Sequence, residues 1–149
     1  MSSQNFHNEL KKARSYYKLW KKKKCYCPAL KSEILITKIG WDHLVGNKKH
    51  AKRNLEDKLR RLKLLPYVGF VLEASNTVQD IKVIDNQLHF AFEAVLFLKS
   101  GDLRKIRAVV IQDEVGNKVF LSVMDSKNRV PHPWVEELSK SLRPWSRGR

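Results

Sequence analysis

The sequence predicts an α+β domain with helices first, then an antiparallel sheet of about four strands, then a short C-terminal helix. Two observations predict this class. Apolar residues recur at helical spacing in the first half of the chain, whereas β-branched and aromatic runs fill the second half. Short polar turns separate those runs, so we expect consecutive strands to pair in an antiparallel meander.

Residues 5–24 predict the first helix. Its apolar residues are spaced by three and four, at Phe6, Leu10, Ala13, Tyr17 and Trp20. Four lysines at positions 21–24 lie at the C-terminal end of this helix, where the helix dipole favours positive charge. We expect residues 1–32 to form a basic extension, residues 33–142 the main domain and residues 143–149 a basic tail. The sequence leaves open whether the first helix packs on the domain or reaches toward nucleic acid.

The middle of the chain predicts one strand and two helices. Residues 33–38 are a β-branched run, and Gly40 is expected to turn the backbone after it. Gly46 and Asn47 predict the start of a basic helix over residues 48–62. A second short helix is expected over residues 64–73, with Pro66 in its first turn.

Four strands and a closing helix are expected in the second half. The strands cover residues 81–84, 88–98, 105–112 and 118–124, and the helix covers residues 131–142. Residues 113–117 have the composition of a hairpin loop, which supports antiparallel pairing of the last two strands.

The charge balance predicts a polyanionic partner. The 149 residues include 30 Lys and Arg against 15 Asp and Glu, a formal net charge of +15. Nucleic acid is the first candidate and an acidic membrane surface the second. A basic surface that serves only solubility is the alternative, but the basic residues occur in runs.

Cysteine use and hydropathy favour a cytoplasmic monomer without a cofactor. Cys25 and Cys27 are separated by one residue, which suits neither a mutual disulfide nor a complete zinc site. We interpret both as plain thiols. No run of 18 apolar residues or signal-peptide pattern occurs, so no membrane segment is expected. A toxin domain cut from a longer secreted chain would look the same.

Residues 38–65 hold the groups best suited to chemistry on RNA. An imidazole moves protons near neutral pH, and His43 is the candidate acid or base, with His50 as a second. Arginine forks grip phosphate oxygens and stabilise a pentacoordinate phosphorus, a role open to Arg53, Arg60 and Arg61. The remaining phosphate contacts are expected from Lys48, Lys49 and Lys52. The alternative for all of them is a solvated basic helix.

Two further candidates lie on predicted strands. Alternation places His89 on one strand face with Glu93, opposite Phe90 and Phe92, as a groove pair or an exposed pair. Ser122 is expected on the face of Phe120, with Leu121 and Val123 opposite, so its hydroxyl could orient a phosphate. The chain lacks phosphate-loop, dinucleotide, zinc-protease and serine-hydrolase motifs, and its acids do not cluster for two metals.

The motif order resembles the phage-associated branch of the barnase/EndoU/colicin/RelE-like nuclease group. The resemblance rests on Ile-Thr-Lys-x-Gly-Trp-x-His at 36–43, the basic helix, Arg-Leu-x-Leu-Leu-Pro at 61–66 and Phe-Leu-Ser-Val at 120–123. It implies a curved antiparallel sheet behind N-terminal helices and metal-independent RNA cleavage by 2′-hydroxyl attack. His43 would be the acid or base, Arg53 or Arg61 would hold the phosphate, and Ser122 would complete the site. His50 and His89 remain alternatives for the second acid or base.

Two functions therefore follow from the sequence. The first is a metal-free endoribonuclease, possibly a toxin acting on tRNA or rRNA, whose basic site an acidic antitoxin or immunity protein would block. The second is a non-catalytic nucleic-acid-binding module that uses the same cations. Loss of cleavage with retained binding in His43→Ala would favour the first.

Overall fold

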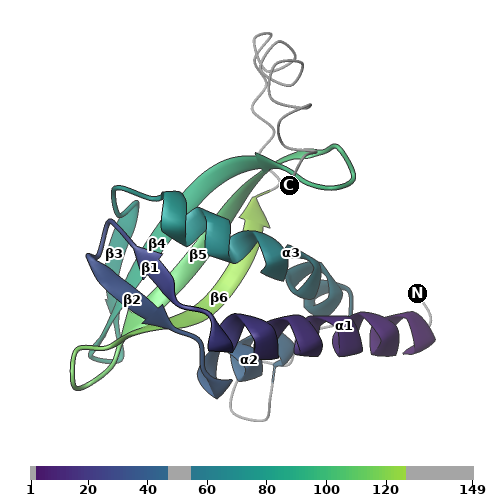
Figure 1. Ribbon diagram of the computed structural model, residues 1–149, viewed down its shortest axis with the longest axis horizontal. Helices are drawn as coiled ribbons and strands as arrows, with labels where there is room; N and C mark the ends of the chain where they lie inside the picture. Colours follow the sequence, from purple (N-terminus) through teal and green to yellow (C-terminus); the bar gives the residue numbers. More distant parts are fainter. Residues whose placement is uncertain (1–2, 47–54, 127–149) are drawn as a thin grey trace, which may run out of the picture.

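The computed structural model describes residues 3–46 and 55–126, which form three helices and six strands (Figure 1). The helices are α1 (Ser3–Lys22), α2 (Lys38–Val45) and α3 (Leu55–Ala74). The strands are β1 (Cys25–Cys27), β2 (Ser32–Leu35), β3 (Asp80–Ile84), β4 (Gln87–Phe97), β5 (Leu103–Gln112) and β6 (Lys118–Ser126). The α+β class expected from the sequence is confirmed.

The sheet is larger than expected and is mixed. Its six strands run in the order β1-β2-β6-β5-β4-β3, and every pair is antiparallel except β2 with β6. The four strands expected from residue 81 onward do form an antiparallel meander, β3 to β6. The expected number of about four is wrong, because β1 and β2 extend the sheet and β2 pairs with β6 in parallel. The parallel pair joins only Ile34 with Lys118 and Leu35 with Val119. Strand β1 was missed because three residues are too few to show an alternating pattern.

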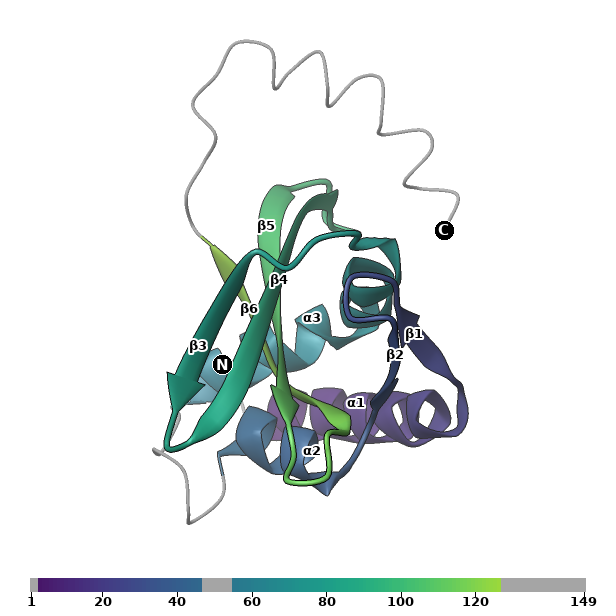
Figure 2. The ribbon, with the colours of Figure 1, turned by 90° about the vertical axis from the view of Figure 1, so that its left-hand side faces the viewer.

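The sheet curves around α3. Figure 2 shows β1 and β2 on one side of this helix and β3 to β6 on the other. The core between them is continuous and includes Leu65 and Val68 from the helix and Phe92 and Phe120 from the sheet, all fully buried. Helix α3 thus stands at the centre of the domain, and its first half meets the free end of β6.

Helix α1 packs on the domain, which settles the question the sequence left open. Ala13, Tyr17 and Trp20 belong to the same core as the sheet. The Trp20 ring meets Phe120 edge-on at a centroid distance of 5.2 Å. The Tyr17 hydroxyl donates a hydrogen bond to the Thr37 carbonyl. Packing is therefore continuous across residue 32, where we expected an extension to end.

Helix α2 replaces the turn expected at Gly40. The predicted strand ends at Leu35, and the Thr37 hydroxyl caps α2 by accepting the Ile39 amide at 3.2 Å. A Cβ on Gly40 would lie 2.6 Å from the Tyr17 hydroxyl and 2.8 Å from the Phe120 carbonyl. Glycine is thus needed for a close helix approach rather than for a turn. The left-handed residue is Gly46, with φ 68°, which ends the helix.

Helix α3 is one continuous helix where we expected two. Pro66 lies inside it and removes one backbone donor. Burial of Leu62, Leu65 and Val68 on both sides of the proline holds the helix together. The first part of the predicted basic helix, in residues 47–54, lies outside the described residues. So do the predicted helix 131–142 and the tail 143–149.

Candidate functional site

The structure brings together two residues that the sequence nominated separately. The Arg61 guanidinium donates a hydrogen bond from Nη1 to Ser122 Oγ at 2.9 Å, although 61 positions separate them. Both residues are buried, with 8% and 2% of their surface exposed. Helix α3 supplies the arginine and β6 supplies the serine, so the contact joins the helix to the sheet.

The other partners of Arg61 show what this contact does. Its Nη1 also donates to the Val123 carbonyl at 3.0 Å, and its Nε donates to Asp57 at 3.1 Å. Strand β6 loses its β2 partner after Val119, so Arg61 bonds a main-chain group in the part of β6 that lies beyond this pairing. The Arg61 guanidinium thus hydrogen-bonds to groups of the protein itself, and its burial leaves little of its surface for contact with a phosphate.

A bulge changes the side-chain alternation expected in β6. Val109 pairs with Ser122 and Val110 pairs with Phe120, so β6 holds one extra residue at this point. Val123 pairs with Ala108, which shares the face of Val110, and therefore lies with Phe120 in the core. The expectation that Val123 faces away from Phe120 is wrong because a bulge interrupts the period of two.

Arg60 belongs to the same ionic cluster but is more exposed. It pairs with Asp57 at 3.0 Å and with Asp125 at 3.3 Å, and the Asp125 side chain is 7% exposed. Two arginines thus meet two aspartates, and the cluster is close to neutral. Neutralised arginines attract a phosphate less than the sequence alone suggested.

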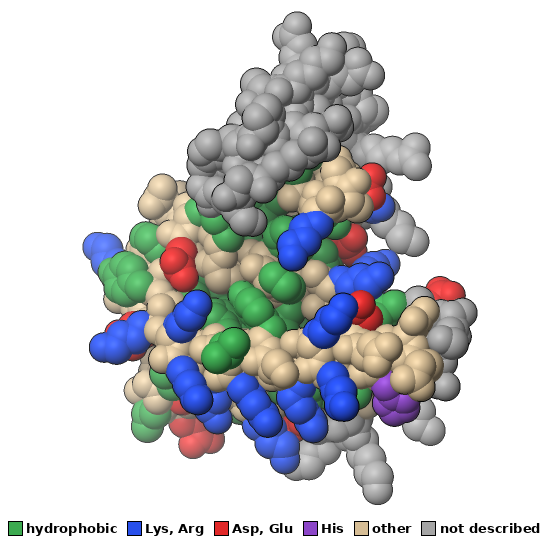
Figure 3. Space-filling view, turned by 45° about the vertical axis from the view of Figure 1, so that its right-hand side comes forward, with side chains coloured by type: hydrophobic (Ala, Val, Ile, Leu, Met, Phe, Trp, Pro, Cys, Tyr) green, Lys and Arg blue, Asp and Glu red, His purple; other side chains and the backbone are tan. Residues whose placement is uncertain are grey.

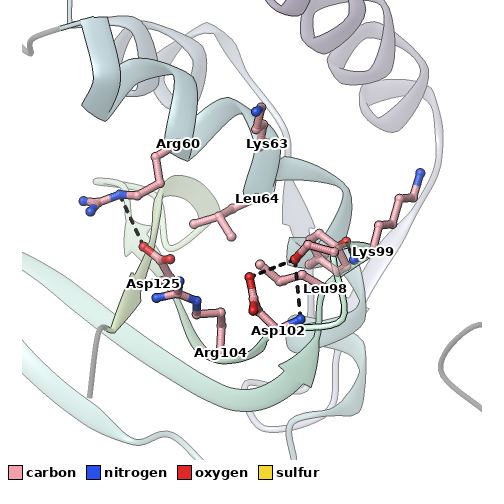
Figure 4. Close-up of a pocket in the computed structure, with 10 residues that line it drawn as sticks. Arg60, Lys63, Leu64, Leu98, Lys99, Asp102, Arg104 and Asp125 are labelled. Carbon is pink, nitrogen blue, oxygen red and sulfur yellow. Dashed lines mark hydrogen bonds and ion pairs between the residues drawn. The ribbon is translucent and has the colours of Figure 1, made fainter. Parts of the chain in front are cut away.

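A pocket opens beside this cluster, between α3 and the hairpin that joins β4 to β5 (Figure 4). We call it the hairpin pocket, and its volume is about 420 Å³. Its charged walls comprise Arg60, Lys63, Lys99, Asp102, Arg104 and Asp125. Lys63, Lys99 and Arg104 form no ion pair within the part of the chain that the structure describes. No local sequence pattern indicates this pocket, because its lining comes from three separate segments of the chain.

The histidines occupy other elements. His43 lies in the last turn of α2 and is half-buried. His89 lies on β4, where Nδ1 is 3.0 Å from the Gln87 carbonyl. Alternation places it on the sheet face opposite the core residues Phe90 and Phe92, away from α3.

The face that carries His89 also carries an ion-pair network. Arg107 pairs with Glu93 at 3.1 Å and with Asp80 at 3.4 Å, and Lys105 pairs with Glu93 at 3.5 Å. The predicted co-facing of His89 and Glu93 follows the strand register. Glu93 is nevertheless committed to these cations and lies four positions along the strand from His89.

Five of the nominated residues lie outside the described residues. They fall within residues 47–54 and are Lys48, Lys49, His50, Lys52 and Arg53. Their predicted roles in catalysis and phosphate binding stay predictions.

An exposed cationic surface lies on α1. Its members occupy about 100° of the helix circumference, beside the face that buries Ala13, Tyr17 and Trp20. We call this surface the basic face of α1, and it consists of Lys11, Arg14, Lys18, Lys21 and Lys22, all exposed. Figure 3 shows Lys and Arg side chains in a row along the helix. The helical spacing that predicted the apolar face of residues 5–24 also places these cations together on one side of the helix. We had not used this grouping to choose site residues.

The basic face of α1 is almost free of acids. The one acidic residue of α1 is Glu9, which pairs at 3.9 Å with Lys12, outside the basic face. Arg14 lies 5.4 Å from the centre of the Trp41 ring, which fixes its base against the domain. Among residues 3–46 and 55–126, no acidic side chain pairs with the basic face.

Buried hydroxyl and thiol groups are poor nucleophiles in this fold. Burial, together with the nearby negative charges of Glu73 and Cys27, raises the pKa of the Cys25 thiol to about 12. Burial also raises the pKa of Tyr16 and of Tyr17. Within residues 3–46 and 55–126, no three His, Cys, Asp or Glu side chains gather as metal ligands. No described helix has an apolar stretch long enough to cross a membrane.

Comparison with known proteins adds no identification. The chain matches no family model, no curated protein and no solved structure. The resemblance to the nuclease group therefore stays a prediction from the sequence.

Proposed function

We propose that this protein binds nucleic acid through its phosphate backbone, with the basic face of α1 as the contact surface. One observation carries the proposal: five exposed cations share one stripe of a helix that is fixed to the core by Ala13, Tyr17 and Trp20. A fixed helix presents its charges without first ordering a flexible segment, so less of the binding free energy is lost.

The dimensions of the stripe suit a polyanion. Lys11 and Lys22 are separated by eleven residues, or about 16 Å along the helix axis. Such a row can meet several successive phosphates, and each neutralised phosphate releases counterions. Backbone contacts of this kind carry affinity without sequence specificity, so we expect binding that weakens steeply with salt.

Ribonuclease activity is a second proposal, and less supports it. In its favour, Arg61 and Ser122 are in contact as the resemblance implied. Against it, the Arg61 guanidinium is already hydrogen-bonded to Asp57, Ser122 and Val123. If cleavage occurs, His43 remains its first candidate acid or base, since its ring is half-exposed on α2.

Incubation with labelled tRNA and rRNA in EDTA tests both proposals. The variants are a triple change of Lys11, Lys18 and Lys22 to Gln and, separately, His43→Ala. A triple change of Lys31, Lys38 and Lys82 to Gln is the matched control, because it removes the same charge from exposed positions elsewhere. Labelled DNA of equal length shows whether RNA is preferred.

The outcomes separate the two functions. RNA that shifts intact with wild type and the control triple, but not with the α1 triple, supports backbone binding by α1. Equal shifts with both triples contradict it. Fragments ending in cyclic phosphate, absent with His43→Ala, support the ribonuclease, whereas intact RNA under all conditions contradicts it.

A further inference from the structure

The hairpin pocket combines a cationic rim with an apolar wall. Its charged lining holds four cations and two aspartates, a formal net charge of +2. Asp125 is already paired with Arg60, and Asp102 accepts a hydrogen bond from the Ser100 hydroxyl at 3.1 Å. The pocket therefore attracts an anion even though acids contribute to it.

The charged side chains lie on two sides of the pocket. Figure 4 shows Arg60, Asp125 and Arg104 on one side and Asp102 on the other, with Leu64 between them, while the Lys99 side chain extends outward. Arg104 is half-buried on β5 and has no acidic partner among residues 3–46 and 55–126. A partly desolvated arginine without a counter-ion binds an anion more strongly than an exposed lysine does.

The apolar wall is formed by Leu64, Tyr67 and Leu98. The Tyr67 hydroxyl accepts the Lys99 amide at 2.9 Å, which ties the ring to the hairpin loop. A tyrosine held in this way offers a ring edge or face to a planar group without further ordering. The pocket volume of about 420 Å³ lies in the range of small-molecule sites.

We propose that the hairpin pocket binds a nucleoside monophosphate group, with the phosphate at the cationic rim and the base against Tyr67 and the two leucines. A phosphate monoester carries a charge of about −1.5 to −2 at neutral pH, which the net charge of the pocket balances. An inorganic anion would leave the apolar wall unused, and a neutral nucleoside would leave the cations unused. Only a ligand with both a phosphate and a base contacts the cationic rim and the apolar wall together.

Two ligands carry a nucleoside monophosphate group: a free mononucleotide and the phosphorylated end of a nucleic-acid strand. The inference goes beyond backbone binding by α1, because it uses a different surface and requires a terminal phosphate. The two proposals can fail independently: mononucleotide binding does not depend on the basic face of α1.

Isothermal titration of the full chain with adenosine 5′-monophosphate, adenosine and inorganic phosphate tests the inference. We expect the mononucleotide to bind at least about tenfold more tightly than either part alone, since each part adds its own contacts. Arg104→Gln and Lys63→Gln should each weaken it several-fold, and Tyr67→Ala should remove its advantage over phosphate. Lys18→Gln, on α1, is the matched control and should leave it unchanged.

Three results would overturn the inference. One is the absence of mononucleotide binding at millimolar concentration to wild type. Another is equal binding of mononucleotide and phosphate. The third is an affinity that Arg104→Gln and Lys63→Gln leave intact while both variants keep the wild-type circular dichroism spectrum.

Oligonucleotides distinguish the two sources. A 5′-phosphorylated 12-mer that displaces the mononucleotide more strongly than its 5′-hydroxyl form, also from the Lys11, Lys18 and Lys22 triple variant, identifies a strand end as the ligand. Equal displacement by the two forms assigns the pocket to the free mononucleotide.

Discussion

Helices α1 and α3 are both 20 residues long and rich in cations, yet they use them in opposite ways. On α3, Arg61 is buried and Arg60 is partly exposed, and the two arginines pair with Asp57 and Asp125. On α1, the basic face points to solvent and holds no acid. The first arrangement connects a helix to a sheet, whereas the second leaves charge available for a partner.

The position of a single acid accounts for much of the difference. Asp57 precedes Arg60 by three residues and Arg61 by four, so one carboxylate reaches both guanidinium groups on the same side of the helix. Glu9 is not spaced in this way from the basic face of α1 and pairs with Lys12 instead. Counting basic residues therefore says less about binding than locating the acids three and four positions away.

The largest expected effect is the loss of the buried arginine. Arg61→Ala leaves the buried Ser122 and the partly buried Asp57 with fewer partners, so we expect the free energy of unfolding to fall by about 3–5 kcal/mol. Urea denaturation followed by circular dichroism measures it. Arg61→Lys, which keeps the charge but loses the fork, should recover part of the loss. A fall below 1 kcal/mol for Arg61→Ala would mean that α3 does not use its arginines structurally.

The next effect concerns the packing that fixes α1 against α2. Gly40→Ala would place a Cβ within 2.8 Å of three atoms, one of them the Phe120 carbonyl oxygen. We expect a loss of about 1–3 kcal/mol by overpacking, despite the better helix propensity of alanine.

Gly69→Ala is the matched control for this substitution. On α3 the added Cβ would meet Trp20 Nε1 at an ordinary 3.5 Å. Thermal unfolding should show this variant to be as stable as wild type or slightly more so. If the two alanine variants behave alike, the close approach at Gly40 is not needed.

A smaller effect should appear at alkaline pH. The pKa of Cys25 is raised to about 12 in the folded protein, from its ordinary value of 9.0. Above pH 9 the unfolded chain loses a proton that the folded chain keeps, so stability is constant below that pH and falls as pH rises toward 12. Unfolding free energies measured from pH 7.5 to 10.5 should fall less steeply for Cys25→Ala. Parallel slopes for the two proteins would contradict a buried, protonated thiol.

The smallest effect is expected on the basic face of α1. Lys18→Ala removes an exposed side chain with no acidic partner, so stability should change by less than about 0.5 kcal/mol. Denaturation under the conditions used for Arg61→Ala provides the measurement. A loss of 2 kcal/mol or more would place Lys18 in the fold rather than in binding.

The sequence predicted elements with a strong period and missed those that depend on partners. The first helix and the β4, β5 and β6 segments were visible in their apolar spacing. Helix α2 was missed because Gly40 was interpreted as a turn, whereas the close approach of Tyr17 and Phe120 explains it. Strand β1 and the parallel pairing of β2 depend on contacts between distant segments, which a local pattern does not reveal.

The sequence predicted which residues meet in the candidate site better than it predicted what those residues do. Arg61 and Ser122 were nominated from distant segments and do meet. The position of Asp57, four residues before Arg61, indicates the competing ion pair, but local spacing does not show that Arg61 is buried. The hairpin pocket forms because the β4–β5 hairpin folds back toward α3. The sequence alone therefore did not show that Arg104 and Lys63 line the same pocket. The basic face of α1 could have been found, because one helical period defines both of its sides.

The most direct test of the account is the salt dependence of nucleic-acid affinity for wild type and for the Lys11, Lys18 and Lys22 triple variant. Fluorescence anisotropy with a labelled single-stranded RNA at several salt concentrations gives the slope of log affinity against log salt. Each lost phosphate contact should reduce the slope by about 0.7, so we predict a slope shallower by about 2. The Lys31, Lys38 and Lys82 triple should keep the wild-type slope. Equal slopes for wild type and the α1 triple would contradict the claim that α1 binds the backbone.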